Sequence, residues 1–335
     1  PHYKESMYAP ITIDDEEFML RPMTCPHHFE LYLSTPHSYR ELPIRIGELA
    51  SLYRYEQSGE LMGLQRVRTF CLADAHIICA DEEHAVAEMA GALDLIEYVT
   101  GVLGLTLDKE YWYRLSLGDR NNTEKYFKDD AGWEKAEKLM RDMLKNRKCE
   151  YVERRRRGIL RTKIDIQMKN TNGKEDTAFT VQYDLSGPER FDLTYTGADG
   201  KEKRAFVIHR SSIGAIERIM AFLIEQYAGA FPLWLSPVQV KVLSISEAHK
   251  VYAEEVFKTL RENDIRVELD ESDETLGKKI RNAKLEKVPY FAVVGEKEMG
   301  NKTVTLESRN GDKSESMSVD DLLKKLREEI EEKKK

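Results

Sequence analysis

The sequence has no apolar run near the roughly 20 residues that cross a membrane, and its polar start, Pro1 to Glu5, lacks the apolar core of a signal peptide. It has only 4 cysteines in 335 residues, too few for a disulfide framework in a chain this long. It also lacks an excess of basic charge, because its formal net charge is −8, which argues against a protein that coats nucleic acid. We therefore expect a cytoplasmic protein with no membrane segment.

Apolar residues make up 41% and charged residues 33% of the chain, enough for a large core and about two domains. Two prolines in the segment Phe231 to Pro237 interrupt an apolar helical pattern, and an alternating strand pattern follows. We predict one domain over residues 1–235 and a second over residues 236–335. The chain begins without Met, in what reads as the middle of an element, so we expect further sequence upstream.

The two predicted domains differ in pattern. Strands dominate the first, and we expect an antiparallel meander of Arg161–Lys169, Ala178–Leu185, Glu189–Thr196 and Lys203–His209. Helices are expected at Glu82–Leu103 and Ala131–Lys145, so the first domain is predicted to be α+β around an antiparallel sheet. Strands and helices alternate in the second domain, which predicts a smaller α/β unit.

A face of charged side chains is predicted on two apolar strands, Ala50–Glu56 and Arg66–Cys79. Alternate residues of an extended chain share a face, so Arg54 and Glu56 point the same way on the first strand. The residues that share a face of the second strand are Arg66, Arg68, Phe70, Asp74 and His76. Guanidinium groups around an aromatic ring, with a carboxylate nearby, suit a ligand that carries phosphates, a flat base and an amine.

A metal site is the functional interpretation of Cys25, His76 and His209. Cys25 alone is only half a site, because no second Cys/His pair follows at zinc-finger spacing, and a buried structural thiol is the alternative. However, His76 and His209 both end apolar strands. One thiolate and two imidazoles leave a fourth zinc position open, which is typical of a site that binds substrate.

The segment Arg210–Arg218 reads as a strand, a Ser cap and an amphipathic helix, in which Gly214 permits close approach of the backbone. Arg218 would then lie about two turns into the helix. With Arg54, it is placed to hold the far end of a triphosphate, although an arginine on such a helix is more often solvated or paired with an acid.

These segments together resemble a known family. Tyr53-Arg-Tyr-Glu56 followed by Arg66-Val-Arg-Thr-Phe70 resembles motif 2 of the class II aminoacyl-tRNA synthetases, and Gly214-Ala-Ile-Glu-Arg218 resembles their motif 3. Further segments are similar to the threonyl-tRNA synthetases in particular: Arg21 to Pro26, Asp74 to Ile77, Ile208 to Arg210, and Phe231 to Val238. The resemblance extends from His2 to about Glu331.

The resemblance implies a ligase with a catalytic domain and an anticodon-binding domain, which joins threonine to its tRNA through a threonyl-adenylate. It implies ATP with Mg²⁺, one Zn²⁺ per subunit and a homodimer. Arg54 and Arg218 would be catalytic. The ATP-binding residues would be Arg54 at the α-phosphate, Glu56 at the adenine amine, Phe70 stacked on adenine, Arg66 and Arg218 at the outer phosphates, and Gln182 at the Mg²⁺ and ribose. Asp74 and Met23 would bind the amino acid, and Cys25, His76 and His209 would bind zinc.

The sequence departs from the family pattern near the expected amino-acid pocket. His27, Leu72, Leu160 and Ala215 stand where the family usually has Gly, Gln, Tyr and a small hydroxyl residue. We expect these differences to affect the rate and the side-chain preference more than the type of reaction. No segment resembles an editing site.

The second domain also departs from the family, because Glu307 stands where an arginine that contacts the anticodon is common. Candidates for anticodon contact are Lys279, Arg281 and Arg309, and ordinary surface charges are an equally good interpretation. The run Arg154 to Arg157 is either a phosphate patch for tRNA or a solvated turn.

Three other functions remain open at this level. A related adenylate-forming enzyme would acylate something other than tRNA or act as a regulator. A zinc-dependent hydrolase would use Cys25, His76 and His209, but it would need a carboxylate base and would leave the arginines unexplained. A module that only binds its ligand is the third possibility. An ATP–pyrophosphate exchange that depends on threonine would distinguish them.

Overall fold

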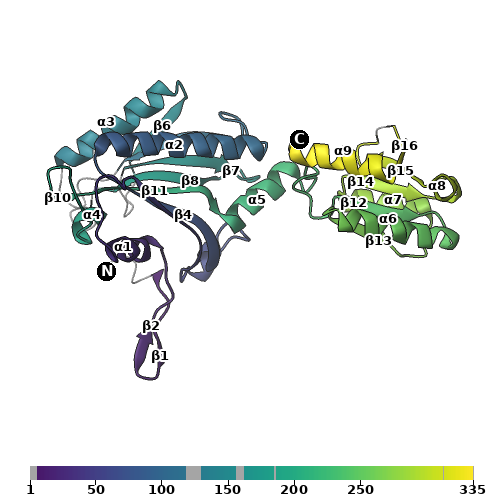
Figure 1. Ribbon diagram of the computed structural model, residues 1–335, viewed down its shortest axis with the longest axis horizontal. Coiled ribbons are helices and arrows are strands. Elements are labelled where there is room, and N and C mark those ends of the chain that lie inside the picture. The colour runs from purple at the N-terminus through teal and green to yellow at the C-terminus, as the bar shows by residue number, and fades with distance from the viewer. Residues whose placement is uncertain (1–5, 118–129, 156–161, 185, 312, 335) are drawn as a thin grey trace. The chain divides into compact units, whose positions relative to one another are not determined.

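The computed structural model describes the chain except for residues 1–5, 118–129, 156–161, 185, 312 and 335. The chain divides into two compact units, Pro1–Phe222 and Leu223–Lys335 (Figure 1). This division falls within helix α5 (Ile216–Tyr227), upstream of the boundary predicted from the prolines. Among the described residues, no helix is long and apolar enough to cross a membrane.

A seven-stranded sheet forms the centre of the first unit, in the order β3-β4-β11-β8-β7-β5-β6. Neighbouring strands are antiparallel except for β5 and β6, which are parallel. The predicted α+β class with an antiparallel sheet is therefore confirmed. The strands are β3 (Ile44–Tyr53), β4 (Thr69–Cys79), β5 (Tyr111–Leu117), β6 (Tyr151–Arg155), β7 (Lys163–Lys169), β8 (Glu175–Asp184) and β11 (Phe206–Ala215).

Two expectations about the strands were wrong. The two strands that were predicted to carry the charged face do not contain all of its residues, because β3 ends at Tyr53 and β4 begins only at Thr69. Arg54 and Arg66 therefore lie in the connecting segment, which also contains a short 3₁₀ helix, η2 (Ser58–Glu60). This segment stays close to the strands because Arg54 N donates to Arg68 O at 2.8 Å. Contacts of the connecting segment, and not alternation along a strand, therefore position the side chains of Arg54 and Arg66.

The predicted four-strand meander is also wrong. Residues 189–196 begin within a short helix, α4 (Gly187–Arg190), because Pro188 suits the first turn of a helix. The remainder, β9 (Thr194–Thr196), pairs with β10 (Glu202–Arg204) in a separate two-stranded sheet. β11 instead lies between β8 and β4 in the main sheet, which moves His209 to the centre of the sheet.

Helices cover the main sheet. α2 (Glu82–Val102) contacts β4, β8 and β11 and runs across the sheet in Figure 1. The Asp81 side chain caps it by accepting from His84 N at 2.8 Å. α1 (Cys25–Leu33) packs through Phe29 and Tyr32 against a cluster that includes Ile78 and Val207. These two strand residues share a face with His76 and His209 because strand side chains alternate, so α1 borders the face that carries the site.

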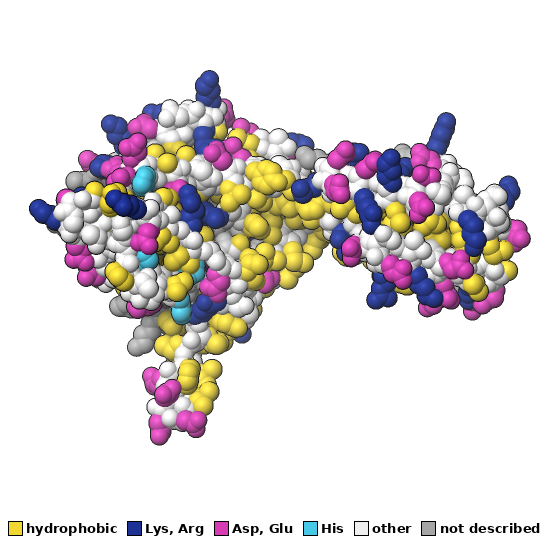
Figure 2. All heavy atoms as spheres, in the orientation of Figure 1, with side chains coloured by type: hydrophobic (Ala, Val, Ile, Leu, Met, Phe, Trp, Pro, Cys, Tyr) yellow, Lys and Arg dark blue, Asp and Glu magenta, His cyan; other side chains and the backbone are white. Residues whose placement is uncertain are grey.

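The other described elements of the first unit are α3 (Asp130–Asn146) and a hairpin of β1 (Ile11–Ile13) and β2 (Glu16–Phe18). Figure 2 shows hydrophobic side chains along this hairpin and acidic side chains at its tip.

The second unit contains a five-stranded mixed sheet in the order β13-β12-β14-β15-β16. β12 is parallel to both β13 and β14, whereas β15 and β16 are antiparallel to their neighbours. The strands are β12 (Val240–Ser244), β13 (Val267–Asp270), β14 (Tyr290–Val294), β15 (Thr303–Ser308) and β16 (Glu315–Ser318). The helices are η3 (Glu247–His249), α6 (Lys250–Glu262), α7 (Leu276–Leu285), α8 (Glu296–Asn301) and α9 (Val319–Glu331). The predicted alternation of strands and helices is confirmed, although α8 was not foreseen.

Candidate active site and metal centre

A cavity of about 670 Å³ lies on the polar face of the main sheet in the first unit. All the predicted site residues except His76 line it: Met23, Cys25, Arg54, Glu56, Arg66, Phe70, Asp74, Gln182, His209 and Arg218. His76 is fully buried beside it. The structure therefore brings together side chains that come from three strands, two helices and the connecting loops.

The metal donors converge because β4 and β11 are neighbours. His76 and His209 are directly opposite each other in the ladder, and His76 Nε2 lies 2.8 Å from His209 Nδ1. Cys25, at the start of α1, places its Sγ 3.5 Å from His209 Nδ1. One ligand atom from each residue lies within 4.8 Å of the others. The three predicted ligands thus form one cluster.

The surroundings of His209 fit a bound cation. Its Nε2 lies 2.6 Å from Asp184 Oδ2, and a carboxylate on the outer nitrogen is the usual support of a metal-bound histidine. Burial lowers the pKa of His209, but the Cys25 thiolate and the bond with Asp184 outweigh it and raise the pKa to about 10. The pocket thus stabilises positive charge among the donors. One thiolate with two imidazoles suits Zn²⁺.

Asp74 lies two residues before His76, on the same face of β4. Its Oδ2 accepts a hydrogen bond from the hydroxyl of Thr24, which is fully buried. Burial raises the pKa of Asp74, while the Thr24 bond opposes that effect. Because Thr24 directly precedes Cys25, this bond also fixes the segment that carries the thiol ligand.

Two arginines also line the cavity, Arg54 and Arg218. The Arg54 guanidinium lies 5.1 Å from the centroid of the Phe70 ring, within cation–π range. Arg218 donates from Nε to Gln65 O at 3.0 Å and from Nη1 to Thr177 O at 2.9 Å. Burial lowers the pKa of Arg218, but an arginine stays charged. Backbone carbonyls therefore orient a half-buried cation at the cavity wall.

Gly214 shapes the strand that leads to Arg218. Its φ is +74°, and a Cβ added there would lie 2.1 Å from Ala178 O, so only glycine fits. The predicted Ser cap is wrong, since β11 continues to Ala215 and α5 begins at Ile216. Arg218 consequently lies in the first turn of α5 and not two turns along it.

Several polar residues of the site were not anticipated. Lys163 lines the cavity, and its Nζ lies 2.9 Å from Asp165 Oδ1. Asp165 is fully buried and also accepts from Arg114 Nη2 at 3.1 Å. The sequence alone could have indicated the proximity of Lys163 and Asp165, because residues two apart on a strand share a face. It could not have indicated the contact of Asp165 with Arg114, because that contact depends on the pairing of β5 with β7.

Two of the residues that depart from the family pattern also meet in the site. Leu72 and Ala215 both line the cavity and are partners in the β4–β11 ladder. They make this part of the wall apolar. Leu160 lies outside the described residues.

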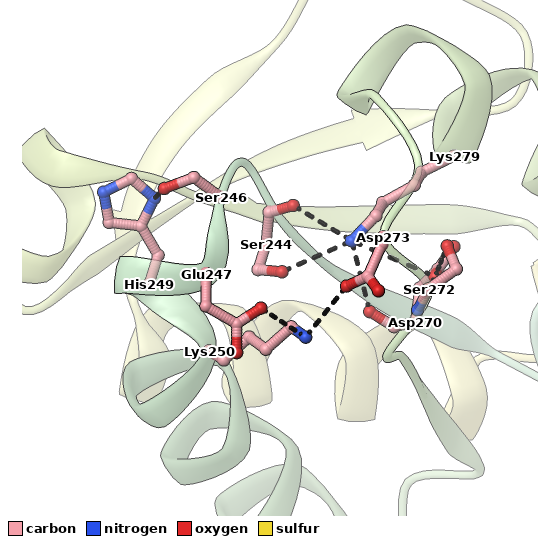
Figure 3. A network of polar contacts seen from close by, with 9 residues as sticks. All are labelled: Ser244, Ser246, Glu247, His249, Lys250, Asp270, Ser272, Asp273 and Lys279. Carbon is pink, nitrogen blue, oxygen red and sulfur yellow. Dashed lines mark hydrogen bonds and ion pairs between the residues drawn. The ribbon is translucent and has the colours of Figure 1, made fainter.

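Two of the three candidates for anticodon contact in the second unit have structural partners. Lys279 is buried, and its Nζ lies 3.3 Å from Ser244 O, 3.4 Å from Ser244 Oγ and 3.4 Å from Asp270 O, at the carboxyl ends of β12 and β13 (Figure 3). Arg309 donates to Lys287 O and Ala230 O, both at 2.9 Å. Arg281 is exposed. Of these three, Lys279 and Arg309 therefore have clear roles in holding the fold.

Comparison with known proteins identifies two domains and several relatives. Residues 8–227 match the tRNA synthetase class II core domain (G, H, P, S and T), and residues 239–329 match the anticodon binding domain. The chain is 48% identical to the threonine–tRNA ligase of Clostridium botulinum over 98% of its own length, and 46% identical to that of Geobacillus kaustophilus over 99%. It covers 51% of each of these relatives, so it spans about half their length.

A solved structure is similar over most of both chains. The crystal structure of the RNA binding domain of threonyl-tRNA synthetase from Cryptosporidium parvum is 34% identical, with a TM-score of 0.88, and the match covers 97% of this chain and 80% of that one. Together with the two domain matches, this similarity confirms the resemblance inferred from the motifs. The chain belongs to the threonyl-tRNA synthetase family of class II aminoacyl-tRNA synthetases.

Proposed function

We propose that this chain activates threonine with ATP to form threonyl-adenylate and transfers the threonyl group to threonine tRNA. The observation that carries the proposal is that one cavity is lined both by residues of the metal cluster, Cys25 and His209, and by Arg54 and Arg218. His76, the third donor of the cluster, is buried beside the cavity. A site of this kind holds an amino acid at one end and a nucleotide at the other. Because the chain spans about half the length of its relatives, the activity of the whole protein is part of this proposal.

Cys25, His76 and His209 would hold one Zn²⁺ per subunit. A zinc ion held there would supply Lewis-acid coordination for an amine and a hydroxyl, and valine lacks the hydroxyl oxygen. Asp74 would accept a hydrogen bond from that hydroxyl, and Met23 would contact the amino acid. This arrangement addresses a selection problem, since an apolar pocket separates such isosteres by only about 10²-fold.

The nucleotide would lie against the other end of the cavity. Phe70 would stack on adenine, Glu56 would accept from the adenine amine, and Gln182 would lie at the ribose and Mg²⁺. Arg54 would bind the α-phosphate, with Arg66 and Arg218 at the outer phosphates. The half-buried guanidinium of Arg218, bonded to two backbone carbonyls, supports this role, because a preorganised cation stabilises charge without reorganising during the reaction.

The reaction requires no protein nucleophile. The threonine carboxylate oxygen attacks the α-phosphorus, the bond to the β-phosphate oxygen breaks, and pyrophosphate leaves with Mg²⁺. Arg54 and Arg218 stabilise the negative charge that builds up at phosphorus. A ribose hydroxyl of the terminal tRNA adenosine then attacks the threonyl carbonyl carbon, and AMP leaves.

The remaining parts of the proposal concern partners. The second domain, residues 236–335, would bind the anticodon of tRNA, and the first, residues 1–235, would carry the chemistry. We propose a homodimer that works in the cytoplasm.

Threonine-dependent ATP–pyrophosphate exchange tests the proposal directly. Exchange together with charging of threonine tRNA supports it. Exchange without charging would instead indicate an adenylate-forming relative that acylates another acceptor. Absence of exchange from a folded, zinc-loaded protein would overturn the proposal and leave a hydrolase or a binding module.

A further inference from the structure

His28 connects the metal cluster to an ion pair on the edge of the sheet. It follows Cys25 by three residues in α1, so the two side chains lie on the same face of the helix. Its side chain is buried, with 4% exposed. His28 Nδ1 lies 2.8 Å from His76 Nδ1, and the two rings meet edge to face at 85°. One turn of α1 thus carries the thiol ligand and contacts an imidazole ligand.

The contact between the two imidazoles determines which nitrogen of His76 carries its proton. Two nitrogens at 2.8 Å need one proton between them, since two lone pairs or two N–H groups would repel. His76 Nε2 belongs to the donor cluster, where it faces His209 Nδ1. If Nε2 keeps its lone pair for a metal, His76 must carry its proton on Nδ1 and donate it to His28 Nδ1.

An anion then fixes the proton of His28. With Nδ1 as acceptor, His28 carries its proton on Nε2, which lies 3.4 Å from Glu48 Oε2. Glu48 is held by Arg21, whose Nη1 donates to Oε2 at 3.2 Å and whose Nη2 donates to Oε1. The bond from Arg21 keeps the pKa of Glu48 below its usual range, so Glu48 remains an acceptor. Every proton from Arg21 to His76 then has a defined position.

The two ligand histidines are therefore supported in parallel ways. His209 donates directly to Asp184, while His76 reaches Glu48 through a second imidazole. We propose that His28 is a positioning residue that, together with Glu48 and Arg21, holds His76 in the tautomer whose Nε2 binds the metal. This inference rests on the proposed zinc site and adds to it residues that would not touch the metal themselves.

The test measures zinc affinity by competition with a chelator, which does not depend on activity. His28→Phe keeps a ring but removes the acceptor, and its zinc dissociation constant should rise by about 10–100-fold, the usual effect of losing such a support. His28→Asn retains an acceptor for His76 Nδ1–H and should recover most of the affinity. Glu48→Ala should weaken binding less than His28→Phe, because it leaves the imidazole pair in place.

The matched control is His27→Phe, because His27 is the exposed neighbour of His28 on the same helix, and its zinc affinity should equal that of the wild type. Cobalt substitution gives a second measurement. His28→Phe should keep the thiolate-to-cobalt charge-transfer band of Cys25 and change the ligand-field bands that report on His76. A role in folding alone would not produce recovery by asparagine.

The outcomes of these zinc measurements distinguish a failure of the positioning role of His28 from a failure of the proposed metal site. Zinc affinity of His28→Phe within about twofold of the wild type would overturn the positioning role, while loss of zinc in Cys25→Ser would leave the metal site standing. Equal weakening by His28→Phe and His28→Asn would also overturn it. A wild-type protein that binds no zinc would overturn the metal site and the positioning role together. If His28→Phe does not fold, Glu48→Ala decides, and a zinc affinity of that variant equal to the wild type contradicts the proposal.

Discussion

His76 lies directly opposite His209 in the β4–β11 ladder, with 2.8 Å between Nε2 of the first and Nδ1 of the second. The two residues are 133 positions apart in the chain, so only the strand order of the sheet makes them neighbours. Their opposition places two imidazole nitrogens close to the Cys25 thiol, beside the cavity.

Metal analysis should find about one zinc per chain, because the cluster offers three donors and an open position. The double variant Cys25→Ser, His76→Ala should lose it. Cys149→Ser is the matched control, since Cys149 lies outside the cluster and its Sγ contacts Leu144 O. Chelation should weaken threonine binding and leave ATP binding in place. A double variant that retains a full zinc complement would contradict the assignment.

Replacing Arg54 or Arg218 by alanine should lower threonine-dependent pyrophosphate exchange by at least roughly 10²-fold, because losing one donor to a developing oxyanion costs about 3 kcal/mol. Exchange assays measure this effect. Arg40→Ala serves as the control, since Arg40 is exposed and its guanidinium lies over Tyr39. Arg218 also bonds to Gln65 and Thr177, so thermal unfolding of each variant must accompany the rates. Rates close to wild type would remove these arginines from the proposed site.

A chain that ends at Pro237 should lose tRNA charging far more than pyrophosphate exchange, because the exchange needs only the cavity of the first unit. Both activities are measured on the same preparation, after circular dichroism and zinc analysis show that the first unit is folded. Equal loss of the two activities in a folded truncation would argue against an anticodon-binding role for the second unit.

Serine should be attached to threonine tRNA at a detectable rate, whereas valine should be rejected almost completely. Serine keeps the amine and hydroxyl and lacks only a methyl group, a difference worth about 1–3 kcal/mol in a pocket. The apolar pair Leu72 and Ala215 in the cavity wall adds no hydrogen bond that would distinguish serine. Labelled serine and purified tRNA measure the reaction. Absence of seryl-tRNA under conditions that yield threonyl-tRNA would show a more selective site.

Asp165→Ala should destabilise the first unit by about 3–5 kcal/mol, because it removes the carboxylate partner of buried Arg114. Glu255→Ala, which removes an exposed ion pair with Lys302, should change the free energy of unfolding by less than about 0.5 kcal/mol. Urea denaturation measures both. Similar small changes in the two variants would show that the buried network does not stabilise the fold.

The Asp165 carboxylate should also make the free energy of unfolding depend on pH. Burial raises the pKa of Asp165, but the ion pair with Lys163 and the bond from Ser116 outweigh it, so the pKa lies below its usual value. A carboxyl group whose pKa is lower in the folded state stabilises the fold at pH values above its pKa in the unfolded state, which is about 3.9 for aspartate. The contribution of Asp165 should therefore be complete above about pH 4 and decline as the pH falls further. The difference in stability between wild type and Asp165→Ala should shrink over that range.

Much of the fold followed from local pattern. Gly173 and Gly200 follow Asn172 and Asp199 in turns, with φ of +75° and +73°, and such Asn-Gly and Asp-Gly pairs favour turns. The segment around residues 187–196 was misread because Pro188 and the bonds from Ser186 N and Gly187 N to Asp184 start a helix where hydrophobic alternation suggested a strand. Local side-chain bonds overrode the pattern there.

The sequence by itself determined which chemical groups are available and to which family the chain belongs. Both depend on residue type and spacing within short motifs, such as Arg66 to Phe70 and Gly214 to Arg218. Only the tertiary structure decided which groups meet. The contact of His28 with His76 depends on helix packing between residues 48 positions apart, and the burial of Asp165 against Arg114 depends on strand pairing between residues 51 positions apart. Strand order and register, which no local pattern specifies, set those contacts.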